Sequence, residues 1–483
     1  MRFLIIVFLC LIYKVSFCQS FYKLYSGNGF DEGQGIAQLT DSSYVITGGS
    51  GSFNDNSQVF LLAVDKLGNY SWSKSYGGSE SDIGKRVLLI PNDGFLIAGF
   101  SNSYGQGDFD ACLIKTDLNG NEEWTKSFNL PSSWEKINDA ALTADSGIVM
   151  VGEILPTANG NSDIYVIRTD KYGDTLWTKR WGSTGPDFAT SIERKNDNFI
   201  IAGQWYISDS TLYKGFLMEI DGNGNEIWKD TISYSGANYV INDVSLSANR
   251  IYAVGNKNTT LKTSAYFGIF DLSGNLLNQF ITEIDQNKYK CKQAQYISTL
   301  NKVAIAYQTI NPSTFQDNFD LVYAFFDSDY LGWMDQYKSI NNEGIDDVGQ
   351  IISTLDGGFA GIGFSNSTGF SQNTFNGGSH IYLFKVGINN IFPETESVTT
   401  LNQLVRTNNI ESTIGKLYPN PVNSILKIQF KKQGTYNFNL FDIYGKEIHA
   451  GQLNQFDQMD FTEFPKGIYL LTVDNNSFRI IKE

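Results

Sequence analysis

The feature that most constrains this chain is a unit of about fifty residues that recurs between Phe21 and Val386. Each full copy ends in an Asp turn, and these aspartates are Asp65, Asp117, Asp170, Asp221, Asp271 and Asp327. In the stronger copies the turn leads into a Trp-x-Lys step, as at Trp72-Ser73-Lys74. A fixed period of this length indicates stacked supersecondary units, because each unit buries its apolar surface only against its neighbours.

Within each unit, apolar and aromatic residues alternate with polar ones, and Gly, Asn and Asp punctuate the runs. This pattern predicts β-strands joined by tight turns. One strand type, which ends like Val45-Ile46-Thr47-Gly48, occurs seven times, whereas the Trp-x-Lys type follows only six Asp turns. Phe21–Tyr25 matches the copy missing after Val386. The sequence therefore predicts an all-β fold, a seven-bladed β-propeller over residues 19–386 closed by its N-terminal strand.

The N-terminus is predicted to be a signal peptide over residues 1–18. Arg2 precedes an apolar stretch, Phe3–Ile12, that is too short to span a bilayer. The alternative makes Cys18 a lipidated N-terminus, although Phe17 stands where a lipobox requires a small residue. We expect no transmembrane segment in the mature chain.

Residues 387–415 are rich in Asn, Thr, Ser and Glu and show no period, which predicts a linker. Residues 416–483 return to short alternating runs, which predict a small C-terminal β-sandwich. Three motifs mark this tail: Tyr418-Pro419-Asn420-Pro421, Tyr444-Gly445-Lys446 and Gly467-Ile468-Tyr469.

With these motifs in this order, the tail resembles the type A sorting domain of the type IX secretion system of Bacteroidetes. The resemblance implies a partner, the type IX machinery, and a location that is secreted or at the outer cell surface. The sorting-signal residues it implies are Tyr418, Pro419, Asn420, Pro421, Gly445, Gly467 and Tyr469. The repeats resemble secreted bacterial propellers at Tyr76-Gly77-Gly78 and Asp93-Gly94-Phe95, and this supports the fold alone.

Composition argues against several classes of function and site. The formal charge is -15, and an acidic chain is a poor binder of nucleic acid. Only Cys112 and Cys291 remain after residue 18, in blades expected to lie too far apart for a disulfide. His380 and His449 have no Cys, acid or second His at ligand spacing, which argues against a zinc site or a serine triad. We predict no cofactor, no metal and no catalytic residue.

Two groups of carboxylates leave alternatives open. The turn Asp117-Leu118-Asn119-Gly120-Asn121 resembles half a calcium loop, but its spacing also fits a hairpin turn, which we favour. Paired carboxylates could serve a glycosidase. The candidates precede the first strand of their blades, which favours a shared structural role: Asp31, Glu32, Glu80, Asp82, Asp187, Asp346 and Asp347.

The connections between second and third strands are predicted to be long loops on one face, whereas the opposite face has tight turns. One of these loops is expected over Gln204–Lys214. Aromatic rings beside amide groups suit sugars or peptides, so we predict ligand contacts at Tyr104, Trp205, Tyr206 and Phe370. We favour a non-enzymatic module that binds an extracellular glycan or protein. The alternatives are a polysaccharide hydrolase or lyase using carboxylates on that face, and a purely structural surface protein.

Overall fold

A computed structural model describes most of the chain. The described residues are 20–27, 29–52, 56–105, 109–156, 160–207, 212–233, 236–260, 262–282, 288–310, 319–328, 337–340, 346–365, 379–387, 396–400, 414–418, 422–430, 434–442, 446–454, 456–473 and 476–482. They form two compact units, Met1–Leu404 and Val405–Glu483. Both units are built from β-strands, as predicted. Among the described residues, no helix has the length and apolar character needed to cross a membrane.

The described part of the first unit holds six four-stranded antiparallel sheets, each made of four consecutive strands. The first sheet contains β2 (Asp31–Gln38), β3 (Tyr44–Ser50), β4 (Gln58–Val64) and β5 (Tyr70–Tyr76). The second contains β6 (Asp82–Ile90), β7 (Gly94–Ser101), β8 (Asp110–Thr116) and β9 (Glu122–Phe128). The third contains β10 (Ser133–Leu142), β11 (Ile148–Pro156), β12 (Asp163–Thr169) and β13 (Thr175–Trp181). The fourth sheet contains β14 (Phe188–Lys195), β15 (Asn198–Ile207), β16 (Leu212–Ile220) and β17 (Glu226–Ile232). The fifth contains β18 (Asn238–Leu246), β19 (Ile251–Asn258), β20 (Thr263–Phe270) and β21 (Leu276–Ile281). The sixth contains β22 (Lys288–Ile297), β23 (Lys302–Ile310), β24 (Phe319–Asp327) and β25 (Tyr337–Ile340).

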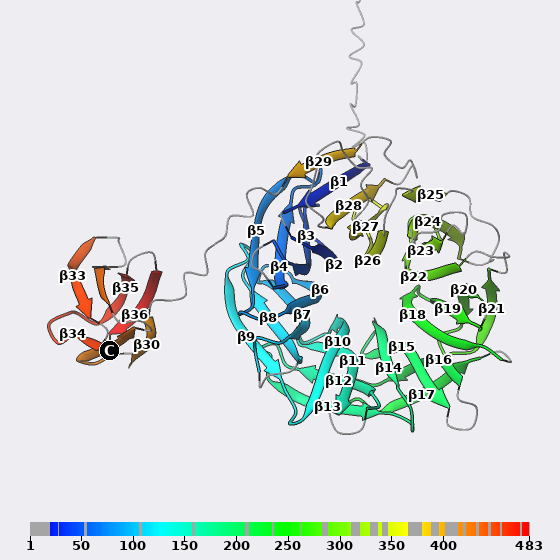
Figure 1. Ribbon diagram of the computed structural model, residues 1–483, viewed down its shortest axis with the longest axis horizontal. Helices are drawn as coiled ribbons and strands as arrows, with labels where there is room; N and C mark the ends of the chain where they lie inside the picture. Colours follow the sequence, from blue (N-terminus) through cyan, green and yellow to red (C-terminus); the bar gives the residue numbers. More distant parts are fainter. Residues whose placement is uncertain are drawn as a thin grey trace, which may run out of the picture. The chain divides into compact units, whose positions relative to one another are not determined.

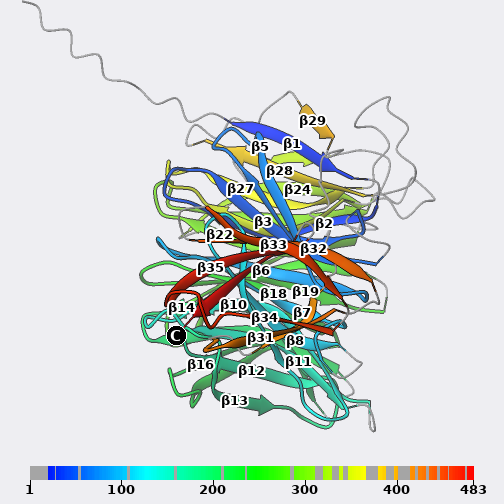
Figure 2. The ribbon, with the colours of Figure 1, turned by 90° about the vertical axis from the view of Figure 1, so that its left-hand side faces the viewer.

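These sheets follow one another around a centre, with the first strand of each sheet innermost (Figure 1). We call β2, β6, β10, β14, β18, β22 and β26 (Asp346–Ser353) the inner strands. In the side view the strands run from one face of the unit to the other, so their turns collect on the two faces (Figure 2).

The last sheet joins the two ends of this unit, as the sequence predicted. It has the order β26, β27 (Phe359–Ser365), β28 (His380–Val386), β1 (Phe21–Ser26) and β29 (Glu396–Thr400). β1 pairs antiparallel with β28, with Phe21 opposite Lys385 and Tyr25 opposite Ile381. Phe21 and Tyr25 also share a core cluster with residues of the first and last sheets, including Phe60 and Leu383.

The Trp-x-Lys step has a structural explanation. The Trp72 ring of β5 packs on Gly120 in the Asp turn of the next sheet, and the Tyr76 hydroxyl donates to the Gly120 carbonyl oxygen at 2.7 Å. Gly120 has a φ of 72°, and a Cβ there would lie 2.6 Å from the Trp72 ring. Both the backbone conformation and the lack of space therefore require glycine. β1 repeats this contact on the first sheet, where Phe21 packs on Gly68 and the Tyr25 hydroxyl donates to the Gly68 carbonyl oxygen at 2.6 Å. β1 therefore takes the place of an outer strand.

Part of the predicted linker forms a strand. β29 lies within residues 387–415 and pairs parallel with β1, with Tyr22 opposite Glu396 and Ser26 opposite Thr400. The outer edge of β1 offers unpaired backbone groups, and an extended segment can pair with such an edge whatever its side-chain pattern. Composition alone therefore could not reveal this strand.

The second unit consists of two sheets in its described part. One has the order β30 (Ile414–Tyr418), β31 (Ile425–Phe430), β34 (Phe456–Asp460), and the other β33 (Glu447–Asn454), β32 (Thr435–Phe441), β35 (Gly467–Val473), β36 (Asn476–Lys482). Alternate residues of these strands, such as Leu426, Leu440 and Leu471, form a single apolar core. The alternation seen in the sequence is therefore the inward–outward alternation of strands that bury one face.

Candidate binding site

Every inner strand carries a β-bulge, at which one residue has no partner on the second strand of its sheet. A bulge re-aims the side chain of its extra residue. The bulge residues are Gln34, Lys85, Asn138, Thr190, Asn242, Lys292 and Gly349. All of them line one cavity of about 470 Å³, so each sheet of the first unit contributes to the same site.

The cavity lies toward the beginnings of the inner strands. Two residues of second strands, Glu153 and Phe364, also line it, and they pair with Lys136 and Asp347 ahead of the bulges. Because first and second strands run antiparallel, this end of the sheets carries the connections between second and third strands. The cavity therefore lies on the face where the sequence analysis expected binding.

Three neighbouring bulge residues bind the next sheet. The Asn138 side-chain amide donates to the Ala189 carbonyl oxygen at 2.8 Å. In the same way the Thr190 hydroxyl donates to Ile241 O and the Asn242 amide to Cys291 O, both at 2.6 Å. We call Asn138, Thr190 and Asn242 the neutral arc. Its donors are used to connect sheets, since an unpaired carbonyl at these positions would be costly.

The opposite side of the cavity carries charge. Lys292 forms an ion pair with Asp347 at 3.1 Å. The Lys85 ammonium donates to Gln34 Oε1 at 3.0 Å, and the Gln34 amide donates to Glu32 Oε2 at 3.1 Å. We call Glu32, Gln34, Lys85, Lys292 and Asp347 the charged arc. Its residues lie on the inner strands β22, β26, β2 and β6, which belong to the closing sheet and its neighbours.

Burial perturbs the charged arc. It lowers the pKa of Lys85, an effect opposed by the nearby Glu32 carboxylate. Burial also raises the pKa of Glu32, while the hydrogen bond from Gln34 and the charge of Lys85 act in the opposite direction. Perturbed titratable groups around a cavity are typical of functional sites, although ion pairs that only support the fold produce them too.

Charges one residue beyond the bulges serve the fold. Arg86 pairs with Asp139 at 2.6 Å, and Asp139 also accepts the backbone N–H of Ile192 at 3.0 Å. Asp243 accepts the Ser191 hydroxyl at 2.7 Å and the Ala294 N–H at 2.8 Å. Burial raises the pKa of Asp243 to about 7, and these bonds only partly offset it. These contacts link adjacent inner strands.

The carboxylates at the starts of the inner strands hold loops, which is the structural role favoured from the sequence. Asp31 accepts the Ser52 hydroxyl at 2.7 Å and the Gly27 N–H at 3.0 Å. Asp82 repeats this with the Ser103 hydroxyl and the Gly78 N–H. Asp187 accepts the N–H groups of Ser183 and Tyr206. Among the predicted carboxylates, Glu32 and Asp347 are the ones that join the charged arc.

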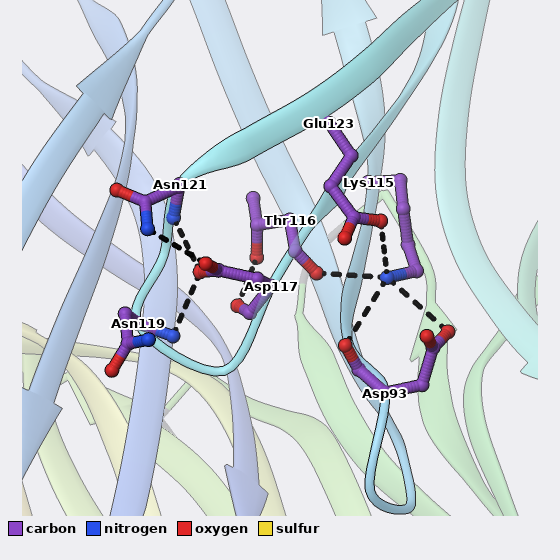
Figure 3. Close-up of polar contacts among 7 residues, drawn as sticks. All are labelled: Asp93, Lys115, Thr116, Asp117, Asn119, Asn121 and Glu123. Atoms are coloured by element: carbon purple, nitrogen blue, oxygen red, sulfur yellow. Dashed lines mark hydrogen bonds and ion pairs between the residues drawn. The ribbon is translucent and has the colours of Figure 1, made fainter. Parts of the chain in front are cut away.

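The Asp turns are hairpin turns whose carboxylates are used internally (Figure 3). Asp117 Oδ1 accepts the N–H groups of Asn119 and Asn121 at 2.8 and 2.7 Å, and Oδ2 accepts the Asn121 side-chain amide at 2.6 Å. Beside the turn, the buried Lys115 ammonium lies 2.8 Å from Glu123 and 3.2 Å from Asp93. Among the described residues, no group of three His, Cys, Asp or Glu side chains could hold a metal ion.

The predicted aromatic contacts do not form one site. Tyr104 packs on the apolar cluster around Val87 and Phe95, and burial raises its pKa. Trp205 and Tyr206 belong to β15, so the loop predicted over Gln204–Lys214 is wrong at both ends. β15 extends to Ile207 and β16 begins at Leu212, with Trp205 opposite Lys214. Phe370 lies outside the described residues.

Trp205 and Tyr206 are already engaged with their own sheet. The Lys229 ammonium lies 3.6 Å from the Trp205 ring centroid, and the Tyr206 ring packs 5.4 Å from that of Tyr213. Neither residue lines the cavity formed by the bulges. Their predicted role in ligand binding stays a prediction, but the structure does not bring them to the polar residues of the inner strands.

The remaining sequence-based candidates have local explanations. Cys112 and Cys291 are both buried free thiols. His380 begins β28, and burial lowers its pKa. In the second unit, His449 contacts the Phe438 ring, with centroids 5.3 Å apart.

Only part of the predicted sorting signal can be placed. The Tyr469 hydroxyl donates to the Pro465 carbonyl oxygen at 2.6 Å, and Gly467 begins β35. The side chain of Tyr418, the segment 419–421 and Gly445 lie outside the described residues. The role of these residues in sorting therefore stays a prediction.

Sequence reasoning missed the bulges. A signal for them is present, because each inner strand has a polar or glycine residue next to its bulge, as in Gly84-Lys85-Arg86 and Asn242-Asp243. Aligning the repeats on these positions would have placed the polar side chains on one level of the fold.

Comparison with known proteins identifies the tail. Residues 416–483 match the family described as the secretion system C-terminal sorting domain. This match implies export by type IX secretion, to the cell surface or the medium. A search of the curated proteins found no match to the chain.

The solved structures with a similar fold include propellers. The chain resembles the β-propeller domain of the Trilobed protease from Pyrococcus furiosus (12% identity, 74% of this chain, 98% of that chain, TM-score 0.40). It also resembles the Pan2 WD40 domain from Neurospora crassa (13% identity, 74% of this chain, 90% of that chain, TM-score 0.46). A third similar structure is the polysaccharide lyase PL25 ulvan lyase (12% identity, 75% of this chain, 96% of that chain, TM-score 0.49). At these identities the likenesses say nothing about ligand or activity.

Proposed function

We propose that residues 19–386 form a closed seven-bladed β-propeller and that residues 416–483 form a small β-sandwich that directs its export. In this proposal residues 1–18 are a signal peptide, and the segment 387–415 connects the two domains and contributes β29. The pairing of β1 with β28 and the matching contacts of Phe21 and Trp72 on successive Asp turns support the closure. Closure removes the exposed edges that an open array would leave.

The proposed function of the propeller is to bind an extracellular glycan or protein at the cavity between the inner strands. The observation that carries this proposal is the shared bulge, which aims one residue from each inner strand into a single cavity of about 470 Å³. That volume is in the usual range for ligand pockets. The charged arc supplies both donors and acceptors there, while the neutral arc keeps the wall rigid.

The enzymatic alternative, a polysaccharide hydrolase or lyase, has less support. Of the residues that the structure describes, the carboxylates that line the cavity are Asp139, Glu153 and Asp347. Two of them are held in ion pairs, Asp139 with Arg86 and Asp347 with Lys292. A pair of carboxylates free to act as acid and base on a sugar requires a different arrangement. We therefore favour binding without catalysis.

Binding at the charged arc can be tested with the full exported chain. A panel of oligosaccharides, peptides and extracellular proteins would be screened against the wild type and the Lys85→Gln variant. We expect a ligand whose affinity falls at least about tenfold in Lys85→Gln, because the variant loses the ammonium that faces the cavity. Lys66→Gln, at an exposed Asp turn, is the matched control and should bind normally. Equal binding by both variants, or the absence of any ligand, would contradict the proposal.

Export can be tested separately. Removing residues 416–483 should leave the propeller inside the cell envelope, because the type IX machinery then has no sorting domain to recognise. Fractionation of cells that produce the full and shortened chains would measure this. Normal amounts of the shortened chain at the surface or in the medium would contradict the assigned role of the tail.

A further inference from the structure

A pair of aromatic rings stands at the edge of the cavity beside the charged arc. Phe364 lines the cavity, and its ring centroid lies 5.7 Å from that of Phe30. Phe30 is 49% exposed although it is a large apolar residue. Its backbone is fixed, because its carbonyl oxygen accepts the Gly51 N–H at 2.8 Å. Phe30 therefore presents an exposed apolar ring beside a polar cavity.

In the part of the chain that the structure describes, the lining of the cavity is balanced in charge. It contains three cationic side chains, Lys85, Arg86 and Lys292, and three acidic ones, Asp139, Glu153 and Asp347. The chain as a whole carries a formal charge of -15, which repels anions at long range. A ligand rich in sulfate or carboxylate groups would therefore meet an unfavourable field and find no cationic surplus in the cavity.

The polar groups next to the rings suit hydroxyls. Lys85 donates hydrogen bonds, and the Gln34 amide both donates and accepts them. Among the described residues, the Lys85 ammonium donates one hydrogen bond, to Gln34, whereas an ammonium can donate three. A sugar hydroxyl both donates and accepts, and the C–H face of a sugar ring can cover an aromatic ring.

From this geometry we infer that the ligand is a neutral oligosaccharide that stacks on Phe30 and Phe364 and directs its hydroxyls to Gln34 and Lys85. This inference rests on the proposed function, since it names the ligand class of the same cavity. A protein partner fits less well, because a stable protein interface needs about 800 Å² on each side and this site is a concave cavity.

The test uses the full exported chain with panels of neutral oligosaccharides, acidic oligosaccharides and peptides, and measures affinity by calorimetry. We expect binding of a neutral oligosaccharide that falls about tenfold or more in Phe30→Ala. Tyr172→Ala is the matched control, because Tyr172 is 61% exposed at an Asp turn away from the cavity, and it should bind as the wild type does. Thermal melting of both variants checks that the fold is intact.

The outcomes separate this inference from the proposed function. If acidic oligosaccharides or peptides bind and Lys85→Gln abolishes that binding, the cavity is the site but the ligand class is wrong. If a neutral oligosaccharide binds equally well to Phe30→Ala, the stacking role is wrong. If nothing binds, or if binding is indifferent to Lys85→Gln, both the inference and the proposed function fail.

Discussion

The bulge residues of the neutral and charged arcs occupy equivalent positions on the inner strands but use their polar groups differently. On the neutral arc, Asn138, Thr190 and Asn242 each donate to a backbone carbonyl of the next sheet. On the charged arc, Lys85 contacts the side chain of Gln34, and Lys292 contacts that of Asp347. A donor bound to backbone is fixed by the fold, whereas side chains bound to side chains can exchange partners when a ligand arrives. In the proposed function, one repeated bulge thus serves stability on one side and recognition on the other.

The closure beside the charged arc should show the largest effect. Deleting residues 19–27 removes β1 and, with it, the contacts of Phe21 and Tyr25 on the first sheet. We expect the first unit to lose cooperative unfolding or to be unrecoverable as soluble protein, because an outer strand is lost and an edge is exposed. Circular dichroism melting measures this. Removing residues 416–483 is the control and should leave the main transition in place, so equal melting of both truncations would contradict the closure.

The neutral arc should show a stability effect without a binding effect. In Asn242→Ala the Cys291 carbonyl oxygen loses its side-chain donor, so we expect the free energy of unfolding to fall by about 1–3 kcal/mol. Denaturant titration measures this, and ligand affinity should stay at the wild-type value. Asn119→Ala, at an exposed turn, should change stability by less than about 0.5 kcal/mol. A large loss of affinity in Asn242→Ala would break the division between the two arcs.

The Asp turns lie away from both arcs and should behave as local structure. Asp117→Ala removes an acceptor for two backbone N–H groups and one amide, all at an exposed turn, so we expect a loss of about 1 kcal/mol. EDTA should leave the melting temperature of wild type and variant unchanged, because these bonds involve no metal. A marked drop of the wild-type melting temperature in EDTA would revive the calcium alternative.

A pH effect should arise at Asp243, one residue beyond the bulge of its strand. Its pKa in the folded protein is raised to about 7 by burial, so the folded state holds the proton more tightly than the unfolded chain does. This contribution is fully favourable below the unfolded pKa of about 4 and is lost as the pH rises through about 7. The melting temperature of Asp243→Asn minus that of the wild type should therefore be larger at pH 8 than at pH 5. Melting curves with the same difference at both pH values would contradict this reasoning.

Much of the strand arrangement could be predicted from the sequence because it depends on local residue patterns. The Asp turns and the alternating strands depend on neighbouring residues, and counting strand types was enough to pair Phe21–Tyr25 with β28. The structural role of Asp31 and Asp82 also followed, because their equivalent placement in the repeat reflects an equivalent task.

The candidate site escaped prediction because it depends on contacts between distant parts of the chain. Gln34 and Gly349 line the same cavity although more than three hundred positions separate them. The extension of β15 through Trp205 was hidden for a related reason, since its pairing with β16 supplies an order that the polar sequence does not suggest. Aromatic content alone therefore pointed to the expected face but not to the cavity.

The most direct test of the central claim is hydroxyl-radical footprinting of the full chain with and without its ligand. This method reports the solvent exposure of side chains such as Phe30 and Tyr172, which are both exposed in the free protein. Binding at the charged arc predicts protection of Phe30 and of the segment 346–365, with Tyr172 unchanged. Protection of Tyr172 or of the segment 204–207 without protection of Phe30 would show that the ligand binds elsewhere.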